Sequence, residues 1–555
     1  MKKIIVLILF ILSGINKSES QTPTLGLMQN EAGSFDGYTL FSPNTYSKSY
    51  LIDNCGNMVN SWQGSSQPGL SAYLLENGML LRTARVNNAI FSATGGSGGR
   101  IEMYDWPNNL IWAYNYSDST HHQHHDIEYL PNGNVLVLAW ETKSANYVLD
   151  RGRSPSLVNS SLWLEHIVEL APMGLAGANI VWEWHVSDHL IQDIDSSKLN
   201  YGIVQNHPEL INFNFANSAN QDWLHINSID YNPHLDQIIL SVHNSGEIWI
   251  IDHSTSSAEA AGHTGGNSGK GGDLLYRWGN PRAYLRGASA DQKLWGQHDA
   301  HWIEPGLNDA GKIMVFNNGI GRTGANYSSV DIIQTPLDSS RNYYLNGAAA
   351  YGPDTLDWQY SSTPASAFYS SNISGAQRLP NGNTLICEGS SGNFFEIDTN
   401  KLIVWNYINP VNQTGPLSQG SNPTGNAVFR CTRFGSNYTG FNGQNLTAGL
   451  PVELNPYPSN CTIYTSIAEN DFENKFSSIE IYPNPVLNEL FIKSFIGAKA
   501  SIEIMDMQGR VYKKFDTSEN EIRIPLQDIP AGIYIICIRD IKSVISKRII
   551  KISPD

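Results

Sequence analysis

Short apolar segments that end in two aromatic residues recur along the chain. The clearest four have the order apolar, apolar, aromatic, any residue, aromatic, and they lie at 110–114, 180–184, 274–278 and 403–407. Weaker copies at 58–62 and 355–360 bring the number to six. Apolar and aromatic runs of this length, bounded by turn residues, predict β-strands.

A turn signal stands before several of these segments. Asn-Gly occurs at 77–78, 132–133 and 381–382, and each time an apolar strand pattern follows it. Both residues of such a turn must tolerate positive φ, which makes Asn-Gly between apolar runs a strong hairpin signal. Each repeat therefore predicts a unit of four antiparallel strands. Units of this kind, repeated around an axis, are the blades of a β-propeller, and six copies predict six blades.

The pattern changes near residue 477. Short alternating strands follow, separated by turns at 508–509 and 530–532, which is typical of a small antiparallel β-sandwich. At the other end, two lysines precede an apolar run at 4–12 and small residues up to Ser20, the pattern of a cleavable signal peptide. The predicted organisation is all-β: a signal peptide at 1–20, a six-bladed β-propeller at 21–470 with blade strands ending near Pro410, and an antiparallel β-sandwich at 477–555.

The charge of the chain limits its partners. A net charge of −16 at pH 7 argues against nucleic acid, because phosphate contacts need basic patches. Long-range steering also works against an anionic substrate, so any anion site must be local. After the short apolar run at 4–12, no segment approaches the length of a membrane span, which predicts a soluble or surface-attached mature protein.

The five cysteines are an odd number for an exported protein, and no CxxC pair occurs among them. This argues against a zinc–thiolate site. Two alternatives stay open: a Cys431–Cys461 disulfide in the Gly-, Pro- and Asn-rich stretch after the last repeat, or five free buried thiols.

All 15 histidines fall between His121 and His301, in about a third of the chain. Three groups of them lead into the predicted inner strands of the third, fourth and fifth blades, at 121–126, 222–228 and 297–302. Inner strands run along the central channel of a propeller, so residues at their equivalent ends converge. Converging imidazoles predict nucleophilic or acid–base chemistry, or alternatively a metal site. For any single histidine, hydrogen bonding within a blade is the simpler interpretation.

Two common hydrolase signals fail in this chain. His185 and His189 have the spacing of a zinc-peptidase helix, but Val186 stands where that motif needs a glutamate. No GxSxG segment occurs, which removes the usual esterase signal. We expect neither a metal nor a cofactor.

Four segments together resemble the arylsulfate sulfotransferase family: 222–231, 297–302, 315–322 and 377–383. They stand in the order of the family, and the likeness spans roughly residues 45–410. The resemblance implies a six-bladed propeller that transfers a sulfuryl group from an aryl sulfate ester to a phenolic acceptor without a nucleotide sulfate donor. It also implies a ping-pong route through a sulfated histidine.

The resemblance extends to single residues. His225 and His298 match channel histidines that hold the sulfuryl oxygens, and Arg322 matches the arginine that neutralises them. Sulfuryl transfer spreads negative charge over three oxygens, as phosphoryl transfer does, so a buried arginine and imidazole donors suit that reaction.

The chain departs from the family at the nucleophile. The family has its nucleophilic histidine late, in the last blade, where this chain has no histidine at 388–394. Either His301 or His125 replaces it, or transfer is direct, or the propeller only binds glycans or other ligands. The catalytic residues expected to line one pocket are His125, His225, His298, His301 and Arg322, with substrate bound by His124, Asn227 and Asn318.

The last segment has a resemblance of its own. The motifs at 482–485, 509–510, 532–534 and 547–548 resemble, in that order, the C-terminal sorting domain of the Bacteroidetes type IX secretion system. This implies the type IX machinery as a partner and a secreted or cell-surface location, reached through the periplasm. A carbohydrate-binding or adhesion sandwich is the alternative.

Overall fold

The structure is a computed structural model that describes residues 22–91, 95–215, 220–338, 342–464, 480–493, 500–506, 510–517, 519, 521–539 and 544–553. It divides into two compact units, Met1–Tyr464 and Thr465–Asp555. The predicted signal peptide lies outside the described residues, and so does the predicted boundary at 477.

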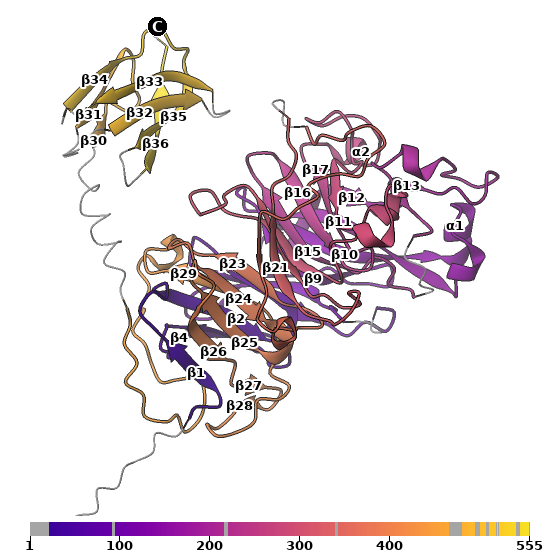
Figure 1. The fold of residues 1–555 in the computed structure, drawn as a ribbon, viewed down its shortest axis with the longest axis horizontal. Coiled ribbons are helices and arrows are strands. Elements are labelled where there is room, and N and C mark those ends of the chain that lie inside the picture. The colour runs from indigo at the N-terminus through magenta and orange to yellow at the C-terminus, as the bar shows by residue number, and fades with distance from the viewer. Residues whose placement is uncertain are drawn as a thin grey trace, which may run out of the picture. The chain divides into compact units, whose positions relative to one another are not determined.

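The first unit consists of antiparallel sheets that repeat along the chain (Figure 1). Sheet 1 contains β29 (Val428–Gly435), β2 (Gly37–Pro43), β3 (Lys48–Ile52) and β4 (Met58–Gln63). Sheet 2 contains β5 (Pro68–Leu74), β6 (Leu80–Arg85), β7 (Gly99–Tyr104) and β8 (Leu110–Asn115). Sheet 3 contains β9 (His121–Tyr129), β10 (Val135–Ser144), β11 (Ser161–Met173) and β12 (Gly177–His185).

Three further sheets complete the series. Sheet 4 contains β15 (Ile226–Asn232), β16 (Gln237–Val242), β17 (Glu247–Asp252) and β18 (Tyr276–Trp278). Sheet 5 contains β19 (His298–Trp302), β20 (Ile313–Asn317), β21 (Ser329–Ile333) and β22 (Trp358–Tyr360). Sheet 6 contains β23 (Gly375–Arg378), β24 (Thr384–Glu388), β25 (Asn393–Ile397), β26 (Ile403–Ile408) and, outside β26, β1 (Gly26–Asn30).

The first strands of these sheets form a closed ring. Contacts run from β29 to β5, then to β9, β15, β19 and β23, and from β23 back to β29. A ring of inner strands with sheets radiating from it is a β-propeller, so the predicted all-β propeller is confirmed. The described residues of this unit form six such sheets, and the predicted number of blades stays a prediction.

The aromatic repeat explains how neighbouring sheets are joined. The six copies fall on the outer strands β4, β8, β12, β18, β22 and β26. In five of these strands a tryptophan indole N–H donates to a backbone carbonyl of the next sheet, at 2.7–2.9 Å: Trp62 to Asp105, Trp112 to Gly177, Trp184 to Gly272, Trp278 to Pro353 and Trp405 to Asn54. Each such hydrogen bond therefore ties the outer strand of one sheet to the backbone of its neighbour.

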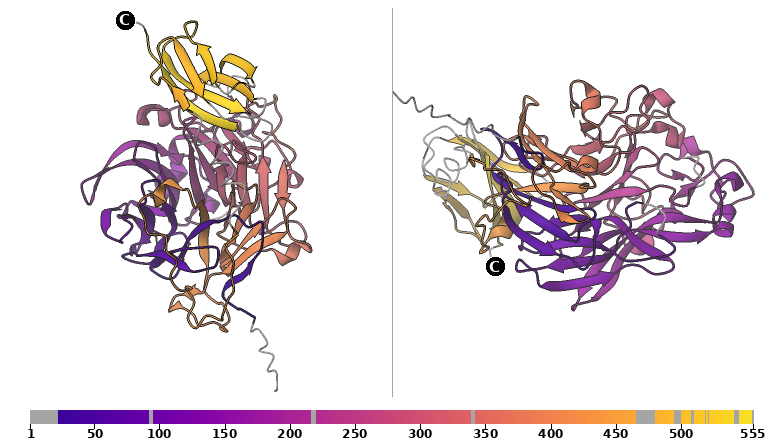
Figure 2. Two further views of the ribbon diagram at one scale, coloured as in Figure 1. Left: turned by 90° about the vertical axis from the view of Figure 1, so that its left-hand side faces the viewer. Right: turned by 90° about the horizontal axis from the view of Figure 1, so that it is seen from below.

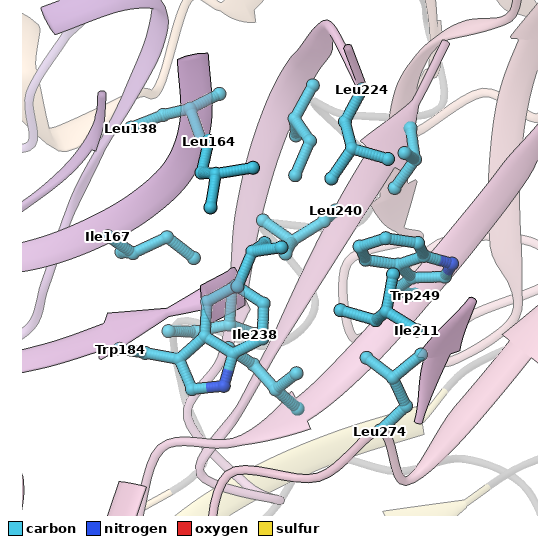
Figure 3. Packing of buried hydrophobic residues seen from close by; sticks show 14 of the residues in the cluster. Leu138, Leu164, Ile167, Trp184, Ile211, Leu224, Ile238, Leu240, Trp249 and Leu274 are labelled. Carbon is cyan, nitrogen blue, oxygen red and sulfur yellow. The ribbon is translucent and has the colours of Figure 1, made fainter. Parts of the chain in front are cut away.

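Apolar side chains fill the space between the sheets. Figure 3 shows the cluster between sheets 3 and 4, where Leu138, Leu164 and Trp184 face Ile238 and Leu240. All five side chains are essentially inaccessible to solvent. Burial of side chains of this size contributes about 1.5–3 kcal/mol each, so neighbouring sheets are held mainly by this packing.

The ring is closed by a strand that the repeat did not reveal. β29 pairs with β2 and supplies the inner strand of sheet 1, and Figure 2 shows this C-terminal strand of the unit beside the N-terminal ones. The prediction that the blade strands end near Pro410 is therefore wrong. A disulfide between Cys55 and Cys461 adds a second closure, and the Cys431–Cys461 alternative is wrong because Cys431 lies on β29 as a free, buried thiol.

Small elements occupy the connections. These are α1 (Ala145–Asp150), α2 (Ser257–Ala260) and the short strands β13 (Leu190–Ile191), β14 (Ile211–Asn212), β27 (Val411–Asn412) and β28 (Gly415–Pro416). Among the described residues, no helix has both the length and the apolar character that crossing a membrane requires.

The second unit is the predicted antiparallel sandwich. One sheet has the order β30 (Glu480–Tyr482), β31 (Glu489–Lys493), β34 (Glu521–Pro525). The other has the order β33 (Val511–Thr517), β32 (Ala500–Asp506), β35 (Gly532–Arg539), β36 (Val544–Lys551). Alternate side chains such as Leu490, Ile504 and Ile536 form its apolar core.

Candidate functional site

The inner strands are irregular at one level of the channel. A β-bulge interrupts the pairing of β9 with β10, of β15 with β16 and of β19 with β20. At or beside these bulges His125, His225 and Asp299 have positive φ values of 49°, 52° and 55°. A non-glycine residue in this conformation is strained, and such strain is concentrated at functional sites. The bulges therefore mark one level of the channel as a candidate site.

Five histidines meet at this level. The ring of His225 lies 4.6 Å from that of His125 and 5.2 Å from that of His243, measured between centroids. The ring of His298 lies 5.5 Å from that of His243. His124 joins the group through a contact of 2.9 Å between its Nδ1 and Nδ1 of His125. We call these five side chains the channel histidine cluster.

His225 is the charged member of the cluster. Its Nδ1–H donates to Asp222 Oδ2 at 2.5 Å, and the Asp222 Oδ1 accepts the indole N–H of Trp140 at 3.1 Å. Burial alone lowers the pKa of His225, but the Asp222 carboxylate outweighs burial and raises that pKa above its usual value. The Asp222 carboxylate therefore favours the imidazolium form of His225, whose Nε2–H is directed away from Asp222.

His243 is the neutral counterpart. Its Nδ1–H donates to the Asn244 side-chain oxygen at 2.8 Å. Burial, together with the charge of His225, lowers the pKa of His243 to about 4. No hydrogen bond from the described residues occupies its Nε2, which therefore carries a free lone pair at neutral pH.

His243 also connects the cluster to a cavity of about 680 Å³. The aromatic rings of Trp295 and Phe215 line this cavity, and so does the cationic side chain of Arg282. The described lining residues include no carboxylate. The cavity is therefore suited to an aromatic molecule that carries negative charge.

His298 has both ring nitrogens engaged. Its Nε2 accepts the backbone N–H of Ile373 at 3.2 Å, so its Nδ1–H donates to the Asn318 side-chain oxygen at 2.8 Å. The Asn318 amide in turn donates to the carbonyls of Ser370 and Ile373. Burial holds the pKa of His298 well below its usual value. His298 is a fixed neutral imidazole in this arrangement, and it positions the loop before β23.

His124 and His125 extend the cluster toward sheet 3. His124 Nε2 lies 2.6 Å from Glu165 Oε2, and the His124 ring stacks on Trp140 at 4.0 Å. Burial lowers the pKa values of both histidines and raises that of Glu165. These directions fit a neutral chain in which the Glu165 O–H donates to His124 and the His124 Nδ1–H donates to His125.

Arg430 divides the channel next to the cluster. Its Nη1 donates to Asp126 Oδ2 at 2.8 Å and to the Tyr73 hydroxyl at 3.0 Å, and its Nε lies 2.8 Å from Asp299 Oδ1. A Cβ atom at Gly375 would come within 2.3 Å of Asp299 Oδ2 and 3.2 Å of Arg430 Cγ, so a larger residue there would displace the Asp299 carboxylate. Burial opposes the charge of Arg430, but Asp126 and Asp299 raise its pKa above its usual value.

Two predicted residues do not lie in the cluster. His301 lines a different cavity, of about 270 Å³, together with Glu128, Asp230 and Arg430. Arg322 lies beside the first cavity: its guanidinium stacks 4.8 Å from the ring of Trp295 and donates to Ser329 Oγ at 2.8 Å. The expected single pocket with all five catalytic candidates is therefore not formed by these residues.

The three expected substrate-binding residues are all buried. His124 belongs to the cluster, and Asn318 holds His298. The Asn227 amide donates to the Gln297 carbonyl at 2.8 Å, while its own side-chain oxygen has no hydrogen-bond partner. Each of them therefore supports the inner strands directly.

Sequence reasoning missed three residues of this site. His243 follows β16, in a strand connection that no inner-strand motif marked, and Asp222 was read only as part of a motif. Arg430 lies on β29, the strand that the repeat did not predict. One signal could have found His243. It stands between two apolar strands of sheet 4, at the position that corresponds to the segment 388–394 between β24 and β25 of sheet 6.

Side chains with the spacing of metal ligands lie outside the channel histidine cluster. Among the described residues they form two groups, Glu141 with His166 and His185, and His189 with His263 and Asp273. His185 and His189, the pair with peptidase-like spacing, thus belong to different groups.

Comparison with known proteins places both units. The profile of a secretion system C-terminal sorting domain matches residues 480–552, which indicates export and a secreted or cell-surface location. Among solved structures, a protein of unknown function from Bacteroides caccae has 10% identity and a TM-score of 0.38, covering 72% of this chain and 99% of its own. Virginiamycin B lyase from Staphylococcus aureus has 10% identity and a TM-score of 0.30, covering 68% of this chain and 86% of its own.

No curated protein matches the sequence. The profile of the arylsulfotransferase (ASST) family matches residues 17–415, which include every sheet of the propeller except the strand β29 that closes it. The chain therefore belongs to the arylsulfotransferase family.

Proposed function

We propose that this protein transfers a sulfuryl group from an aryl sulfate ester to a phenolic acceptor, without a nucleotide sulfate donor, at the channel histidine cluster. Membership in the arylsulfotransferase family supports a sulfotransferase-type function. The observation that carries the proposal is the pairing of a neutral His243, open to a cavity of about 680 Å³, with a charged His225 whose ring is 5.2 Å away.

His243 is the proposed nucleophile. A neutral imidazole with a free Nε2 lone pair can attack sulfur without first losing a proton, and the lowered pKa of His243, about 4, keeps it in that form at neutral pH. His298 is less suited to this role because both of its nitrogens are engaged. His243 follows β16 as the segment 388–394 follows β24, so a histidine on sheet 4 would replace the one expected on sheet 6.

His225 is the proposed general acid. In the first step His243 Nε2 attacks sulfur, the ester O–S bond breaks, and the departing phenolate takes the proton from His225 Nε2. In the second step the acceptor oxygen attacks sulfur, the N–S bond breaks, and neutral His225 takes the proton of the acceptor. Both histidines return to their starting state. Asp222 stabilises the imidazolium in each half-reaction, as the carboxylate of a catalytic triad does.

Arg322 and Trp295 are proposed to recognise the donor. The Arg322 Nε is buried without a hydrogen-bond partner, and its guanidinium lies beside the cavity wall formed by Trp295. The indole offers a face for the aryl ring, and the guanidinium offers charge for the sulfate oxygens. The type IX machinery is the proposed partner of the sandwich, which delivers the enzyme to the cell surface.

The first experiment looks for the covalent intermediate. Incubation of purified protein with a chromogenic aryl sulfate, in the absence of acceptor, should add one sulfuryl group to His243, detected by mass spectrometry of peptides. His243→Gln should lose the adduct and most phenol release. His207→Gln is the matched control, because His207 is exposed and Glu209 is the one hydrogen-bond partner of its side chain among the described residues.

Other outcomes would change the proposal in distinct ways. Phenol release without any histidine adduct would mean direct transfer or hydrolysis, and an adduct on another histidine would move the nucleophile. If the wild type gives neither adduct nor phenol, the protein is a binding propeller and the sulfotransferase proposal is wrong.

A further inference from the structure

A second group of histidines crosses the whole of sheet 3. His121 on β9 lies opposite Glu141 on β10, and His166 on β11 lies opposite His185 on β12. The rings of His166 and His185 stack 5.2 Å apart with an angle of 5° between their planes. Glu141 is joined to this pair by a distance of 3.3 Å between its Oε1 and His185 Nδ1. One face of the sheet thus presents a continuous row of ligand-type side chains.

His166 is the unusual member of the row. The side chain is 3% exposed, and its Nδ1 has no hydrogen-bond partner. Its other nitrogen, Nε2, lies 2.8 Å from the hydroxyl of Tyr116. A buried ring nitrogen without a partner costs free energy. A neutral imidazole has one ring lone pair, and with Nε2–H directed at Tyr116 that lone pair lies on the unpartnered Nδ1.

The side chains around His166 are of the types and at the distances that bind metal ions. One atom each from Glu141, His166 and His185 lies within 4.8 Å of the others. The distance of 3.3 Å between Glu141 Oε1 and His185 Nδ1 is about the edge of a tetrahedron with zinc–ligand bonds of about 2.0–2.1 Å. The second carboxylate oxygen of Glu141 is held by Lys143 at 2.7 Å, and Tyr116 can accept the Nε2–H of His166. Such outer hydrogen bonds orient metal ligands.

We propose that Glu141, His166 and His185 bind a divalent transition-metal ion of the zinc class on the face of sheet 3. Two imidazoles and one carboxylate leave a fourth position for water or for His121, whose side chain is 29% exposed at the edge of the row. The ion would link β10, β11 and β12 across the sheet. It enters from solvent past His185, which is 26% exposed.

The other group of potential ligands is a different kind of site. His189 donates its Nε2–H to the Ala260 carbonyl, and Asp273 Oδ1 lies 2.8 Å from Nδ1 of both His189 and His263. These atoms satisfy one another without an ion. This second group therefore serves as the internal control for the first.

The test is a metal titration of the full chain, purified without a polyhistidine tag and dialysed against a chelator. Zinc binding is measured by calorimetry, and Co²⁺ is added separately to record its visible spectrum. We expect His185→Gln and Glu141→Gln to bind one zinc ion fewer than the wild type, or to lose at least about 100-fold in affinity. His263→Gln should bind as the wild type does.

The Co²⁺ spectrum of the wild-type protein tests the proposal even if a variant fails to fold. Wild-type protein should give the intense bands of four- or five-coordinate Co²⁺, and one equivalent of Zn²⁺ should abolish them. A six-coordinate aqueous Co²⁺ spectrum, or equal zinc binding in wild type and His185→Gln, would overturn the proposal. Loss of zinc in His263→Gln alone would do the same, because it would assign the ion to the second group.

Discussion

The cavity lined by His243 and the cavity lined by His301 differ in charge although each contains a histidine. The cavity at His243 has Arg282 and amide side chains on its described lining and no carboxylate. The cavity at His301 is lined by Glu128, Asp230, Asp299 and Glu304, with Arg378 and Arg430. In a chain of net charge −16, an anionic ester is attracted only where the local charge permits it. The first cavity is therefore the one suited to an aryl sulfate.

The carboxylates of the second cavity strengthen this contrast. Burial and the neighbouring Asp230 raise the pKa of Glu128 well above its usual value, and burial raises that of Asp230 to about 7. The Asp230 carboxyl also caps the backbone N–H of Trp302 at 2.9 Å, and Asp126 caps that of Ile229 at 3.2 Å. These acidic groups satisfy inner-strand amides that no strand ladder reaches, which is a structural role.

Arg430 separates the two environments. Its guanidinium is paired with Asp126 and Asp299, so its charge is already neutralised and is not available to a substrate. Arg322, by contrast, has no ion pair with a carboxylate among the described residues. A buried arginine is thus a candidate for anion binding only when no neighbouring carboxylate neutralises its charge.

The largest effect is expected for Asp222→Asn, which tests the charged histidine of the first cavity. Without the carboxylate, the pKa of His225 falls and the general acid is lost, so turnover should drop roughly 10²–10⁴-fold. The pH profile supplies a second reading. Turnover needs neutral His243, above about pH 4, and protonated His225, so activity should fall as the pH rises through the raised pKa of His225.

In Asp222→Asn that alkaline limb should move to lower pH, because the variant loses the group that raised the pKa. An unchanged profile would show that His225 is not the acid. His207→Gln serves here too as the control for loss of a surface histidine.

A smaller loss is expected for Arg322→Ala. Removing one donor to a developing charge costs roughly 10²–10³-fold in turnover, and initial rates with a chromogenic aryl sulfate would measure it. Arg322→Lys keeps the charge but loses the planar group that stacks on Trp295, so it should recover only part of the activity. Equal rates for Arg322→Ala and wild type would place the sulfate oxygens elsewhere.

The sequence predicted the repeat better than the closure. The aromatic copies marked all six outer strands because the same contact recurs in successive sheets. In most of them, an indole of the outer strand donates a hydrogen bond to the backbone of the neighbouring sheet. β29 is an inner strand, which the aromatic copies do not mark. Its partner β2 lies almost 400 residues away in sequence, so only ring closure brings the two strands together. The Cys55–Cys461 disulfide was not among the two alternatives left open for the cysteines, because its residues are 406 positions apart in sequence.

The sequence likewise predicted only part of the site. Three of the predicted histidines at inner strands, His125, His225 and His298, lie in one cluster, where His243 links His298 to His225. His301 was grouped with them because it lies on the same inner strand. The bulge in β19 leaves His298 and His301 on one face of the sheet, since they pair with Phe316 and Met314. A strand rises about 3.3 Å per residue, however, and this carries His301 along the channel to the second cavity, a level that no sequence pattern showed.

The smallest effect is expected for His301→Gln, which tests the comparison of the two cavities directly. His301 Nδ1 already bonds to the Asp299 carbonyl at 3.0 Å, and the carboxyl groups that line its cavity disfavour an anionic ester there. Turnover of an aryl sulfate should stay within about threefold of the wild type, and the sulfuryl adduct should persist. His243→Gln, the same substitution in the other cavity, is the matched variant. Loss of the adduct in His301→Gln with retention in His243→Gln would reverse the assignment, because the nucleophile would then lie on the acidic side of Arg430.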